Sequence, residues 1–124
     1  MRKIILYLID EDKLLRIKQA FLQEDIYIKT IDKTYLDLKL KDIFDDKEPE
    51  SDKKLSTDEI YDNEFMLLDG FDDEQLKDLI FRFKSNIIAR PITSVRTENN
   101  QNWVLSELLK EIFIENEYMK NMSK

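Results

Sequence analysis

The amino-acid sequence predicts a single compact α/β domain, with about four mainly parallel strands, helices on both faces of the sheet and a long C-terminal helix. Short apolar runs alternate along the chain with stretches of helical periodicity. The chain has 124 residues, the size of one domain. The helical spacing of apolar residues continues longest in the last stretch, from about Asn102 to Met122. Residues 1–124 are therefore interpreted as one unit.

The first half of the chain contains two expected strands and a helix between them. Residues 3–9 form an almost continuous apolar run, which is typical of a strand buried on both faces. Asp10 then suits a helix N-cap, and the helical spacing continues to about Glu24. Residues 25–31 are β-branched and aromatic, as in a second strand. Residues 36–44 fit a strand or a helix, and we favour the helix because a strand has just ended.

The segment 45–59 differs from the rest in composition. It contains seven acidic residues, three lysines, one proline and one leucine. Such a segment buries too little apolar surface to compensate for the entropy lost on ordering. We therefore predict a charged, mobile insertion between the second and third strands.

The second half repeats the alternation of strand and helix. Residues 64–71 predict a third strand, followed by a helix that Asp72 and Gln75 cap together. Pro91 interrupts the next apolar run, which favours an edge strand. The final helix begins near Asn102 and extends to about Met122. Its apolar stripe is wider than one sheet face requires: one face, expected in the core, contains Leu105, Leu108, Leu109 and Ile112, and the stripe extends beyond it to Phe113, Tyr118 and Met122.

The composition excludes several kinds of chemistry. The chain has no histidine, no cysteine and one glycine, so it cannot form a Ser–His–Asp triad, a thiol site, a Walker A loop or a Rossmann fingerprint. A net charge of −7 argues against nucleic acid or an anionic membrane as a partner. No segment has the apolar length of a membrane span. We expect a cytoplasmic protein without a cofactor, and we favour a binding protein over an enzyme.

Acidic residues at the expected strand ends are compatible with two alternative functions, a divalent-metal enzyme and a receiver-like phosphoacceptor. In a parallel sheet Asp10, Asp32 and Asp69 would meet at one edge, where their oxygens could bind Mg²⁺ in a divalent-metal enzyme. Asp10, Glu11 and Asp69 also stand where a receiver domain has its acidic pair and its phosphorylated aspartate. The lysine that a receiver needs after a fifth strand has no counterpart here. Aspartate is moreover the ordinary residue for capping a helix.

Residues 92–119, "ITSVRTENNQNWVLSELLKEIFIENEYM", carry a more specific pattern. A strand is followed by Thr97, Asn100 and Trp103 at three-residue intervals, and then by a Glu–Leu repeat that begins at Glu107. This pattern resembles the C-terminal signature of DUF3783, a family of small bacterial proteins of unknown function. The resemblance implies an α/β fold and brings no established activity.

These observations predict a non-enzymatic binding or regulatory module. Its contact surface is expected at the junction between the fourth strand and the last helix and along that helix. In structural terms, the junction asparagines would cap the helix and the tryptophan would close the edge of the core. In functional terms, Thr97, Asn100 and the free helix start would hold a polar or anionic ligand. The partner is a second copy joined through residues 104–122, or another protein. The candidate contact residues are Arg96, Thr97, Asn100, Trp103, Glu107 and Phe113.

Overall fold

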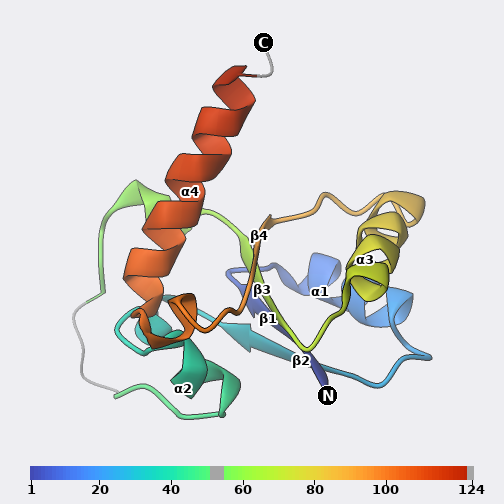
Figure 1. Cartoon of the computed structure of the whole chain (residues 1–124), viewed down its shortest axis with the longest axis horizontal. Coiled ribbons are helices and arrows are strands. Elements are labelled where there is room, and N and C mark those ends of the chain that lie inside the picture. The colour runs from blue at the N-terminus through green and yellow to red at the C-terminus, as the bar shows by residue number, and fades with distance from the viewer. Residues whose placement is uncertain (51–54, 123–124) are drawn as a thin grey trace.

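A computed structural model describes residues 1–50 and 55–122 as one α/β domain with a four-stranded sheet (Figure 1). Three short 3-10 helices, η1 to η3, accompany the main elements. In chain order the elements are β1 (Arg2–Tyr7), α1 (Glu11–Ala20), β2 (Ile26–Ile31), η1 (Lys33–Tyr35), α2 (Leu40–Phe44), η2 (Glu59–Asp62), β3 (Phe65–Asp69), α3 (Asp73–Ser85), β4 (Ile92–Val95), η3 (Asn100–Asn102) and α4 (Leu105–Met122).

The sheet has the strand order β2-β1-β3-β4 and contains both parallel and antiparallel pairs. β1 pairs with β2 in parallel, and so does β3 with β4. The central pair, β1 with β3, is antiparallel. The prediction of a mainly parallel sheet is thus correct within each half of the chain and wrong at the centre, where two β-α-β units meet in opposite directions.

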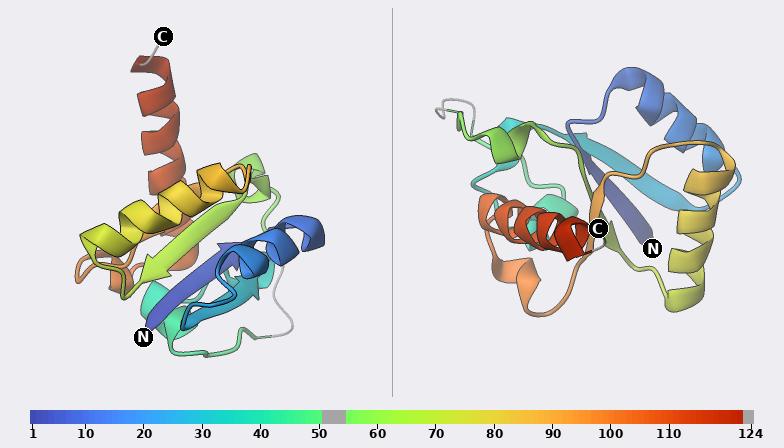
Figure 2. Two further views of the ribbon diagram at one scale, coloured as in Figure 1. Left: turned by 90° about the vertical axis from the view of Figure 1, so that its right-hand side faces the viewer. Right: turned by 90° about the horizontal axis from the view of Figure 1, so that it is seen from above.

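Helices cover both faces of the sheet, as predicted (Figure 2). On one face, α2 and α4 pack over alternate residues of β1 and β3, among them Ile5, Tyr7 and Phe65. On the other face, α1 and α3 pack over the intervening residues, such as Leu6 and Met66. Because β1 and β3 are the two inner strands, both of their faces are buried, which explains their continuous apolar runs.

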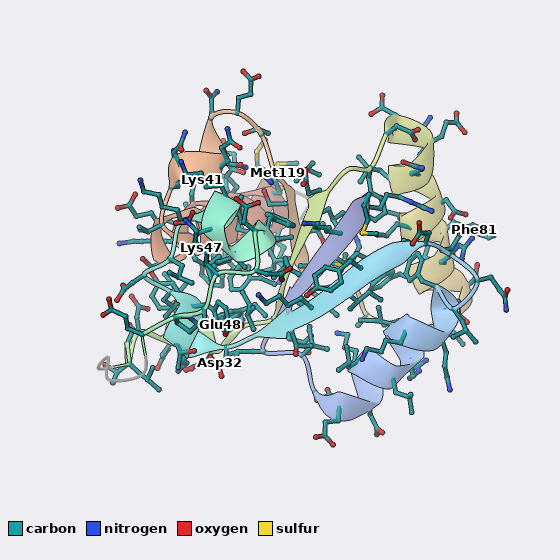
Figure 3. All side chains as sticks on the ribbon, turned by 90° about the horizontal axis from the view of Figure 1, so that it is seen from below. Asp32, Lys41, Lys47, Glu48, Phe81 and Met119 are labelled. Carbon is teal, nitrogen blue, oxygen red and sulfur yellow. The ribbon has the colours of Figure 1, made fainter. Side chains whose placement is uncertain are left out.

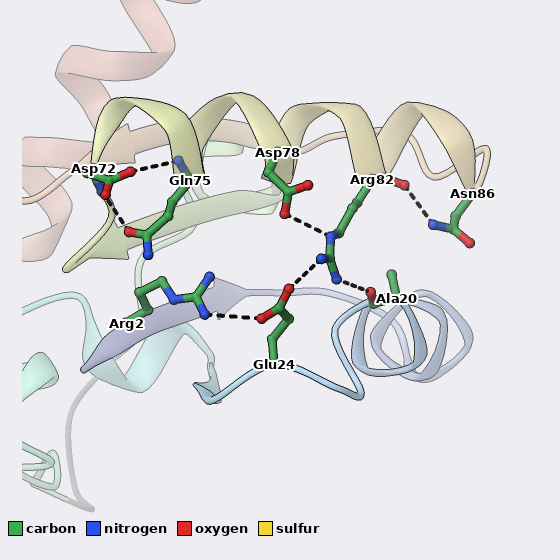
Figure 4. A network of polar contacts seen from close by, with 8 residues as sticks. All are labelled: Arg2, Ala20, Glu24, Asp72, Gln75, Asp78, Arg82 and Asn86. Carbon is green, nitrogen blue, oxygen red and sulfur yellow. Dashed lines mark hydrogen bonds and ion pairs between the residues drawn. The ribbon is translucent and has the colours of Figure 1, made fainter.

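Polar contacts cap α3 and join it to the segment after α1 and to the start of β1 (Figure 4). Asp72 accepts a hydrogen bond from the Gln75 amide at 2.8 Å, and Gln75 accepts one from the Asp72 amide at 2.9 Å. This is the predicted capping box. Farther along α3, Arg82 pairs with Glu24, which also pairs with Arg2 at 3.3 Å. These arginines hold the pKa of the Glu24 carboxyl below its usual value, first through the Arg2 hydrogen bond.

The region between β2 and β3 is more structured than its composition suggests. Of residues 36–44, only Leu40–Phe44 are α-helical, so the favoured helix is shorter than predicted. Asp46, in the predicted insertion, pairs with Lys29 at 3.3 Å and accepts a hydrogen bond from the Tyr27 hydroxyl at 2.9 Å. Figure 3 shows Glu48, from the same segment, near the end of β2. Residues 51–54, in the middle of the insertion, lie outside the described residues.

Candidate functional site

The loop from β4 to α4 is closed by its own side chains. The Asn100 side-chain oxygen Oδ1 accepts from the Thr97 backbone amide at 2.8 Å, and the Thr97 hydroxyl accepts from the Asn100 backbone amide at 3.0 Å. The Asn100 side-chain amide donates to the Val95 carbonyl at 2.9 Å. Thr97 and Asn100, which the sequence placed in a ligand site or a helix cap, therefore fasten the loop and the end of β4.

Arg96 is also engaged within the domain. Its guanidinium pairs with Asp69 at 3.3 Å and donates to the Gln101 side-chain oxygen at 2.9 and 3.2 Å. It also lies over the Phe44 ring, 5.5 Å from the centroid. These contacts hold the loop against the sheet and α2, so Arg96 acts as a structural link at the junction.

The start of α4 does not offer free amides to a ligand. The Leu105 amide donates to the Leu38 carbonyl at 2.8 Å, and the Ser106 amide donates to the Leu36 carbonyl at 2.9 Å. A bridge between Lys39 and Val104 continues this contact. The predicted anion cradle at a free helix start is therefore wrong, because backbone carbonyls from the segment before α2 occupy the first amides.

Trp103 and Glu107 lie on the surface beside this junction. The Trp103 residue is 39% exposed and is not part of either core cluster, so the interpretation that it closes the core is wrong. Glu107 is exposed in the first turn of α4, where a carboxylate is favoured by the positive end of the helix. Both side chains remain available on the outer surface of the junction.

The three aspartates at strand ends do not form a common site. Asp10 caps α1 by accepting from the Lys13 amide at 2.8 Å, and Asp32 caps η1 by accepting from the Thr34 amide at 2.9 Å. Asp69 lies beside Lys3 at the opposite end of β1, because β1 and β3 are antiparallel. Within residues 1–50 and 55–122, no group of three acidic side chains is placed to hold a metal ion. The shared acidic edge expected for a metal enzyme or a receiver is not formed.

Helix α4 divides into a packed half and a projecting half. Leu105, Leu108, Leu109 and Ile112 are buried, which confirms the predicted core face. Phe113 is half-buried and packs against this core, so it is only partly available to a partner. Beyond it, α4 extends away from the rest of the domain (Figures 1 and 2).

The projecting half of α4, residues 114–122, exposes large apolar side chains. Ile114 is 53% exposed, Tyr118 63% and Met122 65%. Their spacing of four residues places them on one side of the helix. The apolar stripe had indicated Tyr118 and Met122, whereas Ile114 was missed because it lies opposite the buried face. The four-residue spacing to Tyr118 was the signal that could have found it.

Strand β4 lies at the edge of the sheet, as Pro91 predicted, and a groove flanks it on each face. On the α4 side a groove of about 360 Å³ is lined by Ile92, Met119 and Lys120 among others. On the α3 side a more apolar groove of about 220 Å³ is lined by Leu76, Ile80 and other residues. Arg90 and Thr93 line both grooves.

The buried tyrosines Tyr7 and Tyr61 use their hydroxyls for hydrogen bonds within the domain. The Tyr7 hydroxyl donates to the Tyr61 carbonyl at 2.8 Å, and the Tyr61 hydroxyl donates to the Ser106 carbonyl at 2.9 Å. Burial raises the pKa of both hydroxyls above the ordinary value. Neither phenol is therefore poised to transfer a proton near neutral pH.

The comparisons with known proteins give one match. Residues 64–119 match the family model described as a domain of unknown function, DUF3783. The matched segment extends from β3 through most of α4, and it confirms the resemblance inferred from the pattern around Trp103. No curated protein and no solved structure matches the chain. No helix in the described part of the chain is long and apolar enough to cross a membrane.

Proposed function

We propose that this chain, whose residues 64–119 match the DUF3783 family model, is a non-enzymatic module that binds protein through the projecting half of α4. The observation that carries the proposal is the exposure of Ile114, Tyr118 and Met122 on one side of a helix that leaves the domain. A contiguous apolar surface of this kind is stabilised when a partner removes it from water.

The use of the reactive side chains supports a non-enzymatic role. Asp10 and Asp32 cap short elements, Asp69 pairs with Arg96, and Tyr7 is buried and hydrogen-bonded. General acid–base catalysis needs a group that can exchange a proton with a substrate. These groups instead maintain the fold. We also propose that the protein is bacterial and is located in the cytoplasm.

The first partner that we propose is a second copy of the chain. If two α4 helices crossed antiparallel with a two-fold axis at Tyr118, Ile114 of each helix would face Met122 of the other. The acidic residues Glu107 and Glu111 would then lie outside the overlap. A contact over residues 114–122 is small for a protein interface, so the association should be weak and dependent on concentration.

Sedimentation equilibrium over a range of protein concentrations tests this proposal. The wild-type chain should self-associate, and the double variant Ile114→Ser/Tyr118→Ser should remain monomeric. Leu22→Ser is a matched control, because Leu22 is 74% exposed but lies on the opposite side of the sheet, after α1. A wild-type chain that stays monomeric at the highest concentration would contradict self-association. Equal weakening by the control would contradict a contact at α4.

A further inference from the structure

The outer edge of β4 is a second exposed surface, and the groove on its α4 side is lined by Glu115, Asn116 and Lys120 rather than by Ile114, Tyr118 or Met122. In the ladder to β3, the Ile92 amide donates to the carbonyl of Glu64, just before β3, at 3.3 Å, and the Arg96 amide donates to the Leu68 carbonyl at 2.8 Å. Because successive residues of a strand direct their backbone groups to opposite sides, Thr93 and Val95 face away from β3. Their backbone groups form the outer edge of the sheet.

At both ends of this outer edge the backbone groups are already hydrogen-bonded or lack an N–H, whereas those at its centre face solvent. Pro91 has no N–H, and its carbonyl accepts from the Thr93 hydroxyl at 2.8 Å. The Val95 carbonyl accepts from Asn100, and the Thr97 amide donates to Asn100. The Thr93 N–H, the Thr93 carbonyl and the Val95 N–H have no hydrogen-bond partner among the residues that the structure describes. These three groups can accommodate one short added strand centred opposite Thr93.

The two grooves would receive the side chains of such a strand. Side chains of an extended peptide alternate between the two faces of a sheet. Those on one face would enter the apolar groove between β4 and α3, which Leu76, Leu79 and Ile80 line. Those on the other face would enter the groove between β4 and α4, which is lined by Lys120, Glu115 and Asn116. A backbone ladder with alternate side-chain pockets is the arrangement by which sheet edges bind peptides.

The charge beside the edge indicates the chemistry of the peptide. Arg90 lines both grooves, is exposed, and has no ion-pair partner within residues 1–50 and 55–122. Lys120 pairs only at 3.7 Å with Glu117, and both side chains are largely exposed. The α4-side groove is lined by Glu115 as well as Lys120, whereas Arg90 is the one charged residue among those that line the α3-side groove, where it supplies a positive charge. A carboxylate on the peptide would complement it.

We propose that β4 binds an extended peptide segment of a partner protein, with an apolar side chain in the α3-side groove and a neighbouring carboxylate beside Arg90 and Lys120. The peptide would form hydrogen bonds with Thr93 and Val95 and would become a fifth strand of the sheet.

Selection from a displayed library of random decapeptides tests this proposal with the whole chain as the target. The enriched peptides should contain an acidic residue with apolar residues at adjacent positions. When added to the protein, a synthetic copy should shift the Thr93 and Val95 amide resonances and slow their hydrogen exchange. Affinity should fall at least about tenfold for Arg90→Glu, which removes the favourable charge and adds a repulsive one. Lys110→Glu, an equal charge change on the exposed side of α4, should have little effect.

Two outcomes would overturn the assignment. The first is that no peptide is enriched, or that the enriched peptides leave the Thr93 and Val95 amides unchanged. The second is that binding is lost with Ile114→Ser/Tyr118→Ser and retained with Arg90→Glu. That result would place the peptide on α4 and leave the function proposed for α4 intact. The exchange measurement uses only the wild-type chain, so it does not depend on how well any variant folds.

Discussion

Ile87 adopts an unusual backbone conformation for its residue type. It follows α3 with a φ of 54°, and its side chain is 84% exposed. The Ile88 amide donates to the Phe83 carbonyl at 2.8 Å and the Ile87 amide to the Lys84 carbonyl at 3.1 Å, which form a Schellman motif. Glycine is the usual residue at this position, because a β-branched residue is strained in the left-handed region.

Ile87→Gly is expected to stabilise the domain by roughly 0.5–1 kcal/mol, since relief of strain should exceed the entropy that glycine adds to the unfolded chain. Ile87→Ala removes the same exposed apolar surface but keeps a Cβ, so it should gain less. Urea unfolding of the three proteins measures the difference. A destabilised glycine variant would show that the isoleucine has packing contacts worth more than its strain.

At the scale of elements, capping was easier to predict than the junction between β4 and α4. Asp10, Asp72 and Gln75 cap their helices as the sequence indicated, because the capping pattern is local. Asn100 does not cap α4 but bonds to Thr97 and Val95 within its own loop, and Trp103 is exposed rather than part of the core. The amides that Asn100 might have capped at the start of α4 are bonded to carbonyls from residues 36–38, which no local pattern indicates.

Asn100→Ala tests the role of this side chain in the loop. It removes an acceptor for the Thr97 amide and a donor to the Val95 carbonyl, so we expect a loss of about 1–3 kcal/mol of unfolding free energy. Asn102→Ala is the matched control in the same short helix, where the exposed side chain should contribute little. Denaturant unfolding monitored by Trp103 fluorescence measures both. Equal stabilities would mean that the loop is held mainly by Arg96.

At the scale of the whole molecule, the sequence predicted the elements better than their directions. The apolar runs located β1 and β3 because both strands are inner strands of the sheet. Their antiparallel pairing was not predictable, since a strand buried on both faces has the same apolar pattern in either direction. Because β3 runs antiparallel to β1, Asp69 lies at the opposite end of the sheet from Asp10, and the expected acidic site does not form.

The buried tyrosines predict how the stability of the molecule changes with pH. The folded-state pKa of Tyr7 is raised, mainly by burial and then by the charge of Asp62, while an unfolded tyrosine titrates near 10. The protonated form is therefore retained in the folded state and lost first from the unfolded state. The contribution of Tyr7 to the free energy of unfolding is therefore fully present below about pH 10 and decreases as the pH rises above that value. Unfolding measured from pH 8 to 11 should show this fall, and Tyr7→Phe should make it shallower. An identical slope in the variant would contradict the assignment to Tyr7.

The antiparallel contact at the centre of the sheet also has a kinetic consequence. β1 reaches β2, and β3 reaches β4, across a single helix, whereas Tyr7 meets Phe65 only after the long connection from β2 to β3 has closed. Closing a longer loop costs more entropy, so this contact should limit the folding rate. Flexible residues inserted within 45–59 should slow refolding in stopped-flow experiments and leave the unfolding rate nearly unchanged. The two β-α-β units would then form first, and their meeting in opposite directions would complete the fold.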